Sequence, residues 1–199
     1  RDSSTSRGLG DVYKRQGLSQ DVETDDNVFR QTTARLPWLL IGMLGGIGNS
    51  MILGNFDSTF AAHPEMALYI PLIGGTGGNV GTQSSALVVQ GLANSSLNAE
   101  NTFKQVLKES VVALINATII SMLVYIYNFI RFGATATVSY SVSISLFAVV
   151  MFASIFGTLV PMTLEKLKID PAIATGPFIS ITNDIIGMLM YMGITVLLS

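Results

Sequence analysis

Of the thirteen acidic residues in this chain, only Asp184 lies deep inside an apolar stretch. Phe178 and Ile179 precede it, and a run of Ile, Met and Leu follows it. A carboxylate near the middle of a membrane-spanning helix costs about 2.5–3.5 kcal/mol on insertion scales, so such residues usually face a water-filled path, an ion or a partner charge. We therefore interpret Asp184 as an ion-binding residue. The alternative is a protonated carboxyl group that is hydrogen-bonded to a neighbouring helix.

The second unusual segment is PLIGGTGGNVGTQSS, which covers residues 71–85. It contains five glycines between Gly74 and Gly81, although each glycine costs about 1 kcal/mol relative to alanine in a helix interior. This density predicts a helix that is broken by its glycines and lines a cavity, because irregular backbone at membrane depth is tolerated only there or where protein buries it. Close packing is the alternative, since Gly74/Gly78 and Gly77/Gly81 have the spacing of small residues at helix–helix contacts.

Packing alone does not explain the polar side chains of the glycine-rich segment. In a continuous helix Thr76, Asn79 and Gln83 share one face, because they stand at i, i+3 and i+7. Neutral side-chain oxygens beside glycine carbonyls can bind a hydrated cation. We therefore expect Asn79, Thr82 and the neighbouring glycines to line an ion path.

The same spacing places Ser180, Gly187 and Tyr191 on the face of Asp184. Pro177 has no N–H, which would free a carbonyl in the preceding turn as a further oxygen ligand. Asn183 points elsewhere and is expected to make an interhelical hydrogen bond.

Oxygen ligands, together with the lack of cysteine and of a histidine inside an apolar stretch, favour a hard cation such as Mg²⁺ over Zn²⁺ or Cu²⁺. Co²⁺ and other divalent ions remain alternatives to Mg²⁺ as the bound ion. The single histidine, His63, stands in a short polar loop and is interpreted as a solvated loop residue. One Asp184 per chain is a weak counter-charge for a divalent ion, whereas a two-fold homodimer would place two carboxylates on its axis.

The elements that must position these residues are membrane helices. The chain is 49% hydrophobic and 12% charged with mean hydropathy +0.53, whereas soluble domains carry roughly 25% charged residues. This composition predicts an all-α integral membrane protein with five spans. Each span has about the 20 apolar residues that a bilayer helix needs. The predicted spans cover residues 36–54, 66–93, 106–130, 141–164 and 172–198.

Basic residues between the spans predict the orientation. Six of them fall on one side of the membrane and only Arg131 on the other. Because cytoplasmic loops carry the excess of Lys and Arg, the N-terminus is expected in the cytoplasm and the C-terminus outside an inner (cell) membrane. The six are Arg30, Arg35, Lys104, Lys108, Lys166 and Lys168.

Residues 1–27 are predicted to be a polar N-terminal tail or the remnant of a misread gene start or cloning scar. They lack an apolar segment and do not resemble a signal peptide. No basic patch suggests nucleic-acid binding. No nucleophile–base pair or metal triad near a membrane face suggests an enzyme.

The segment IPLIGGTGGNVGTQSSALVVQGLA resembles the second-helix signature of the MgtE family of magnesium channels and transporters. Residues 35–40, RLPWLL, are similar to the entry of that family's first helix. The stretch DPAIATGPFISITNDIIGMLMY, from Asp170 to Tyr191, is similar to its fourth-to-fifth helix region. The resemblance covers residues 28–199, which would form an MgtE-like transmembrane pore domain. The family's cytoplasmic N-terminal and CBS domains have no counterpart in these 199 residues.

The resemblance implies a homodimer of five-helix protomers with a central pore for Mg²⁺. It also implies that Asp184 holds hydrated Mg²⁺ on the dimer axis. The other metal-site residues expected along the path are Asn79, Gly75, Gly78, Thr82 and Ser180. The chain departs from the family pattern at Gln90, where an arginine is usual, and at residues 116–117, where Asn-Ala replaces a glycine-containing segment.

Two other functions stay open. In an ion-coupled secondary transporter, Asp184 would be the proton or Na⁺ site, and broken helices at the midplane are common in such proteins. In a non-transporting assembly subunit, the glycines would serve packing alone.

Overall fold

The computed structural model describes residues 22–97, 101–133, 136–174 and 176–198, and within these ranges it is helical and contains no strand. The predicted all-α class is confirmed. The first 21 residues of the predicted tail lie outside the described residues. The elements are α2 (Val28–Gly54), α3 (Asp57–Ala62), the 3-10 helix η1 (Pro64–Tyr69), α4 (Ile70–Ala93), α5 (Thr102–Phe132), α6 (Thr137–Lys166), the 3-10 helix η3 (Pro171–Ala174) and α7 (Pro177–Leu198).

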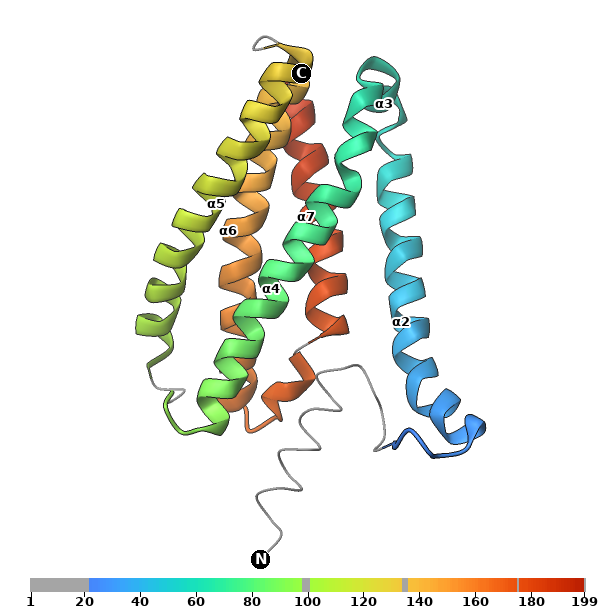
Figure 1. Cartoon of the computed structure of the whole chain (residues 1–199), viewed down its shortest axis with the longest axis vertical. Helices are drawn as coiled ribbons and strands as arrows, with labels where there is room; N and C mark the ends of the chain where they lie inside the picture. The colour runs from blue at the N-terminus through green and yellow to red at the C-terminus, as the bar shows by residue number, and fades with distance from the viewer. Residues whose placement is uncertain (1–21, 98–100, 134–135, 175, 199) are drawn as a thin grey trace, which may run out of the picture.

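The five long helices alternate in direction (Figure 1). The beginnings of α2, α5 and α7 and the ends of α4 and α6 lie at one end of the molecule. That end therefore carries the six basic residues named above, whereas Arg131 in the last turn of α5 lies at the opposite end.

Helices α2, α5, α6 and α7 are long and apolar enough to cross a membrane. Helix α4 is not among these apolar helices, because glycine and polar residues lower its mean hydropathy. It is nevertheless 24 residues long, or about 36 Å at 1.5 Å per residue, which exceeds the roughly 30 Å of a bilayer core. The structure thus shows a membrane protein with four apolar candidate spans and one polar helix of spanning length.

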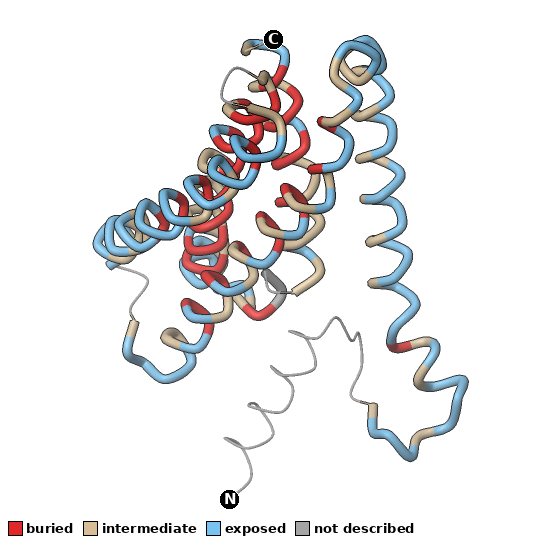
Figure 2. Tube along the Cα trace, turned by 45° about the horizontal axis from the view of Figure 1, so that its top comes forward, coloured by how far each residue is buried: buried red, intermediate tan, exposed pale blue. Residues whose placement is uncertain are grey.

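Helix α6 is the centre of the bundle. More than half of the residues in the apolar 18-residue stretch of α6 are buried, whereas none of the residues in the corresponding stretch of α2 are buried (Figure 2). Val142, Leu146, Val149 and Val150 of α6 pack in the main core with residues from η1, α4 and α7. Helices α4, α5 and α7 are consequently positioned by what they place against α6.

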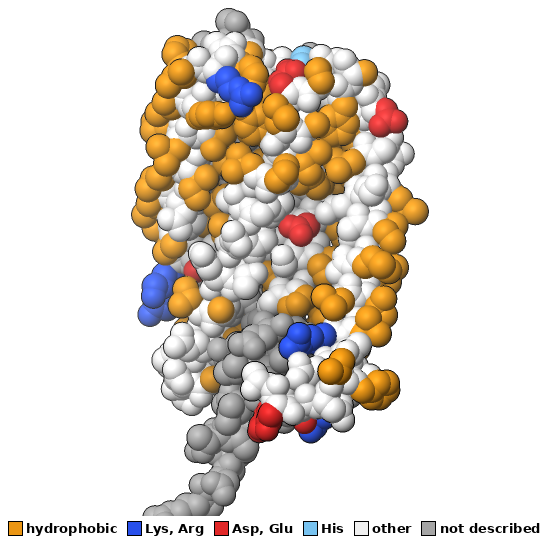
Figure 3. Space-filling view, turned by 45° about the vertical axis from the view of Figure 1, so that its right-hand side comes forward, with side chains coloured by type: hydrophobic (Ala, Val, Ile, Leu, Met, Phe, Trp, Pro, Cys, Tyr) orange, Lys and Arg blue, Asp and Glu red, His pale blue; other side chains and the backbone are white. Residues whose placement is uncertain are grey.

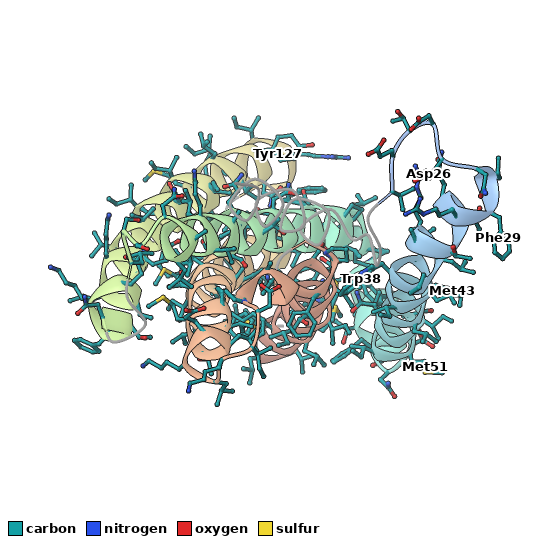
Figure 4. The ribbon with its side chains drawn as sticks, turned by 90° about the horizontal axis from the view of Figure 1, so that it is seen from below. Asp26, Phe29, Trp38, Met43, Met51 and Tyr127 are labelled. Carbon is teal, nitrogen blue, oxygen red and sulfur yellow. The ribbon has the colours of Figure 1, made fainter. Side chains whose placement is uncertain are left out.

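Helix α2 lies at the edge of this bundle and packs on α7 (Figure 4). Its Phe29 and Met43 point away from the other helices, and both are exposed. Its contact with α7 is close, since a Cβ at Gly45 would overlap Ile181. A small residue is therefore what brings α2 against α7.

The helix boundaries differ from the predicted spans most at the starts of α2 and α7. Helix α2 begins eight residues early, at Val28, because Asn27 caps it by accepting a 2.8 Å hydrogen bond from the Arg30 N–H. Beside this cap, the Glu23 N–H and the Arg30 guanidinium hold the pKa of Asp26 below its usual value. The fifth long helix begins at Pro177 rather than at residue 172, because Gly176 takes a left-handed φ of 59° that ends η3.

The predicted break in the second span is wrong. Helix α4 runs without interruption through Gly74–Gly81. These glycines are sites of close packing: a Cβ at Gly77 would lie 2.9 Å from a Val149 methyl group, and one at Gly81 would overlap the Asn183 amide. The helix tolerates them because tight packing on α6 and α7 offsets their propensity cost.

Candidate functional site

A cavity of about 320 Å³ lies between α2, α4 and α7. Side chains from three helices surround it, so no single segment of the sequence contains it. Its lining residues are Asn49, Leu53, Ile70, Pro71, Gly74, Gly75, Gly78, Asn79, Ser180, Asp184 and Met188.

The half-buried Asp184 carboxylate lies against the backbone of α4. A Cβ at Gly74 or at Gly78 would be 3.4 Å from Asp184 Oδ1. The glycines therefore bring the helix surface into contact with the carboxylate, with no side chain between them. In Figure 3, an acidic group stands at mid-height on the face shown, apart from the charged side chains near the two ends.

Ser180 belongs to the same site. It stands one turn before Asp184 on α7, and its Oγ lies 2.9 Å from the position of a Cβ on Gly78. The hydroxyl and the carboxylate thus approach α4 at the same glycine. Both are oxygen ligands on the cavity wall.

Gly75 and Asn79, one helical turn apart on α4, also line the cavity and are exposed. A Cβ at Gly75 would meet nothing within 4 Å, which distinguishes this glycine from its packed neighbours. Five of the six predicted site residues therefore come together in space.

Thr82 is the exception. It is absent from the cavity lining, and its hydroxyl donates a 2.8 Å hydrogen bond to the Gly78 carbonyl in its own helix. Thr76 and Gln83, predicted to share a polar face with Asn79, do not line the cavity either. In an unbroken helix the glycine carbonyls are engaged in the backbone ladder, so the cavity presents mainly side-chain oxygens.

Sequence reasoning missed Asn49 of α2. Its side-chain oxygen is buried at the cavity and has no hydrogen-bond partner within the described ranges. The signal was an amide in the middle of a predicted apolar span, in LGGIGNSMILG. A buried polar group is normally hydrogen-bonded, so an orphaned acceptor beside a carboxylate suits a ligand that donates hydrogen bonds.

The rest of the predicted face on α7 turns away from the cavity. Gly187 packs on Val149, and the fully buried Tyr191 hydroxyl donates to the Met66 carbonyl. Asn183 is buried, yet neither of its side-chain polar atoms has a partner among the described residues, so the expected interhelical hydrogen bond is not found. Pro177 is the first residue of α7, where a backbone N–H has no partner within the helix, so its missing N–H frees no carbonyl of α7.

The chemistry of the cavity suits a hydrated hard cation. It offers one carboxylate, one hydroxyl and two amide side chains, which can accept hydrogen bonds from metal-bound water. Six waters at about 30 Å³ each occupy roughly 180 Å³, which is within the cavity's volume. The site can therefore hold a divalent ion through its water shell.

Comparison with known proteins agrees with this chemistry. The family model MgtE, described as divalent cation transporter, matches residues 70–194, which include α4 and all but the last turn of α7. This chain belongs to the MgtE family. The match spans the cavity walls that α4 and α7 contribute, whereas α2 with its Asn49 lies outside the matched residues.

Three curated relatives are named magnesium transporter MgtE. The Bacillus subtilis (strain 168) protein is 32% identical over 184 residues, which are 92% of this chain and 41% of the relative. The Thermus thermophilus protein is 33% identical, covering 83% of this chain and 36% of the relative. The Enterococcus faecalis protein is 29% identical, covering 86% of this chain and 38% of the relative. The chain thus spans about two fifths of the length of these MgtE relatives.

Proposed function

We propose that this chain moves Mg²⁺, with its water shell, passively across the cell membrane. The observation that carries the proposal is the Asp184 carboxylate at the contact of α7 with Gly74 and Gly78, inside a cavity that also holds Ser180 and Asn79. Mg²⁺ dehydrates reluctantly and prefers octahedral oxygen coordination, so water-mediated binding to one carboxylate and neutral oxygens fits it. Membership of the MgtE family and the names of its relatives support this choice of ion.

The same proposal includes a fifth span and a two-fold homodimer. Helix α4 would cross the bilayer with its polar face on the ion path, which lessens the need for an apolar composition. A two-fold axis along the cavity would pair two Asp184 carboxylates and match the charge of a divalent ion. The cavity would then be half of a pore.

The orientation is part of the proposal too. The end with six basic residues would face the cytoplasm, and the end with Arg131 and the C-terminus would face outside. Support comes from the alternating helix directions, which bring all six residues to one end of the molecule.

The test is ion flux into liposomes that contain the purified chain. Mg²⁺ entry down its own gradient is expected, with no requirement for a pH or Na⁺ gradient. Flux that needs either gradient would instead support the ion-coupled transporter with Asp184 as its proton or Na⁺ site. An Asn49→Ala variant measures whether α2 belongs to the path, with Asn55→Ala at the exposed end of the same helix as its matched control.

A further inference from the structure

Glu109 of α5 joins three helices through one carboxylate oxygen. Its Oε1 accepts a 2.6 Å hydrogen bond from Ser84 of α4 and a second hydrogen bond from Ser154 of α6. The two serine hydroxyl oxygens are 3.0 Å apart and both serines are buried. In the sequence Glu109 does not stand out as an isolated charge, because it lies close to Lys104 and Lys108 near the start of its helix.

Helix α4 needs such directional bonds. At Gly77, Gly78 and Gly81 its contact with α6 and α7 involves residues that have no side chains to interlock with a neighbour. Small-residue contacts allow close approach, but they restrict rotation and sliding less than interdigitated side chains do. Since α5 packs mainly on α6, the long Glu109 side chain adds a hydrogen bond between α5 and α4.

Ser84 is placed to control the cavity face. It stands nine residues after Gly75, which at 100° per residue is about half a turn away from it around the helix axis. Gly75 lines the cavity, whereas Ser84 is buried on the opposite side of α4. The hydrogen bond between Ser84 and Glu109 opposes rotation of α4 about its axis. Such a rotation would turn Gly75 and Asn79 away from Asp184.

We propose that Glu109 is a positioning residue, which sets the rotation of α4 and through it the ion preference of the cavity. It touches no cavity atom and acts through Ser84. The part of this inference that concerns ion preference rests on the proposed function, whereas the part that concerns the placement of α4 does not.

Spin labels test the placement directly. The chain has no cysteine, so cysteines introduced at the exposed Leu87 of α4 and Leu189 of α7 can carry the labels without interference. The purified chain is diluted into an excess of unlabelled chain, so that distances within one chain dominate. Glu109→Ala is expected to shift or broaden the distance distribution, and Glu165→Ala, an exposed carboxylate near the same end, is expected to leave it unchanged.

Competitive flux of Mg²⁺ and Ca²⁺ in liposomes tests the consequence. Ser84→Ala and Glu109→Ala should each lower the preference for Mg²⁺ over Ca²⁺ about threefold. This factor corresponds to the average free energy of an interhelical hydrogen bond in a membrane protein. The double variant should fall no further than Glu109→Ala, because the Ser84–Glu109 hydrogen bond is already absent in that variant. Glu109→Gln keeps an acceptor oxygen and should recover part of the preference; with Ser84→Ala it also carries the test if Glu109→Ala does not fold.

Unchanged distances and unchanged preference in Glu109→Ala would overturn the proposal, as would fully additive effects of Ser84→Ala and Glu109→Ala. If the unmodified chain moves no divalent ion, the proposed function fails. The spin-label distances would then still decide whether Glu109 positions α4.

Discussion

The Tyr191 hydroxyl of α7 donates a 2.8 Å hydrogen bond to the Met66 carbonyl in η1, directly before α4. Both residues are fully buried. Tyr191 lies seven residues after Asp184 on the same helix, and Met66 lies eight residues before Gly74 on the approach to α4. This single bond therefore ties together the two segments that bring the carboxylate against the glycines.

Tyr191→Phe removes this bond and keeps the ring. We expect it to lower the free energy of unfolding by about 1 kcal/mol, because a buried hydrogen bond between α7 and η1 is lost. Thermal unfolding of the detergent-solubilised protein measures the loss. Tyr125→Phe changes an exposed hydroxyl on α5 and should unfold at the same temperature as the unmodified chain. Equal melting of both variants would contradict a stabilising role for the bond.

Asp184→Asn should abolish or severely reduce divalent transport while the protein stays folded. Asparagine keeps the shape of the side chain and removes the charge that balances the ion, and its cost of insertion into the membrane is lower. Mg²⁺ flux into liposomes, normalised to incorporated protein, is the measurement. Asp57→Asn, at the first residue of α3, is the control and should transport normally. Near-normal uptake by Asp184→Asn would favour the hydrogen-bonded packing role for this carboxyl.

Substitutions at Gly75 and Gly78 can distinguish a role in the ion path from a role in helix packing. A side chain at Gly75 meets open space, whereas one at Gly78 meets Ser180 Oγ at 2.9 Å. Gly75→Val should therefore lower Mg²⁺ flux with little change in melting temperature, and Gly78→Val should lower both. The experiment pairs liposome flux with thermal unfolding. Normal flux in Gly75→Val would remove this face of α4 from the path.

Asn79 and Thr82 should differ in their effect on selectivity. Asn79→Ala removes an amide from the cavity wall, and we expect weaker discrimination between Mg²⁺ and Ca²⁺ with little effect on folding. Thr82→Val should leave the ion preference unchanged, since the Thr82 hydroxyl already binds the Gly78 carbonyl. Competitive flux of Mg²⁺, Ca²⁺ and Na⁺ distinguishes the two. A larger effect of Thr82→Val than of Asn79→Ala would reverse this assignment.

The orientation is tested by cysteine labelling in intact cells. Because the chain has no cysteine, single cysteines can be introduced one at a time without background reaction. Those at positions 57 and 131 should react with an impermeant reagent from outside, and those at 104 and 166 should react only after the cells are opened. Labelling at 166 from outside would contradict five spans with this orientation.

The sequence alone determined the membrane class, the approximate apolar helices and Asp184 as the exceptional charge. These are local properties, because a bilayer requires about 20 apolar residues per helix and penalises a carboxylate wherever it occurs. The basic residues likewise predicted which helix ends lie together. Five of the predicted site residues meet at one cavity for a related reason, since helical spacing decides which residues share a face.

Tertiary structure decided how the glycines act. Alone, the glycine-rich segment favours a broken helix, yet α6 and α7 pack so closely on Gly77 and Gly81 that α4 stays continuous. The same packing placed Asn49 of α2 on the cavity wall. It also brought Glu109 to two serines that lie 25 and 45 residues away. Such relationships depend on which helices become neighbours, and that depends on the total burial of all of them rather than on any local spacing.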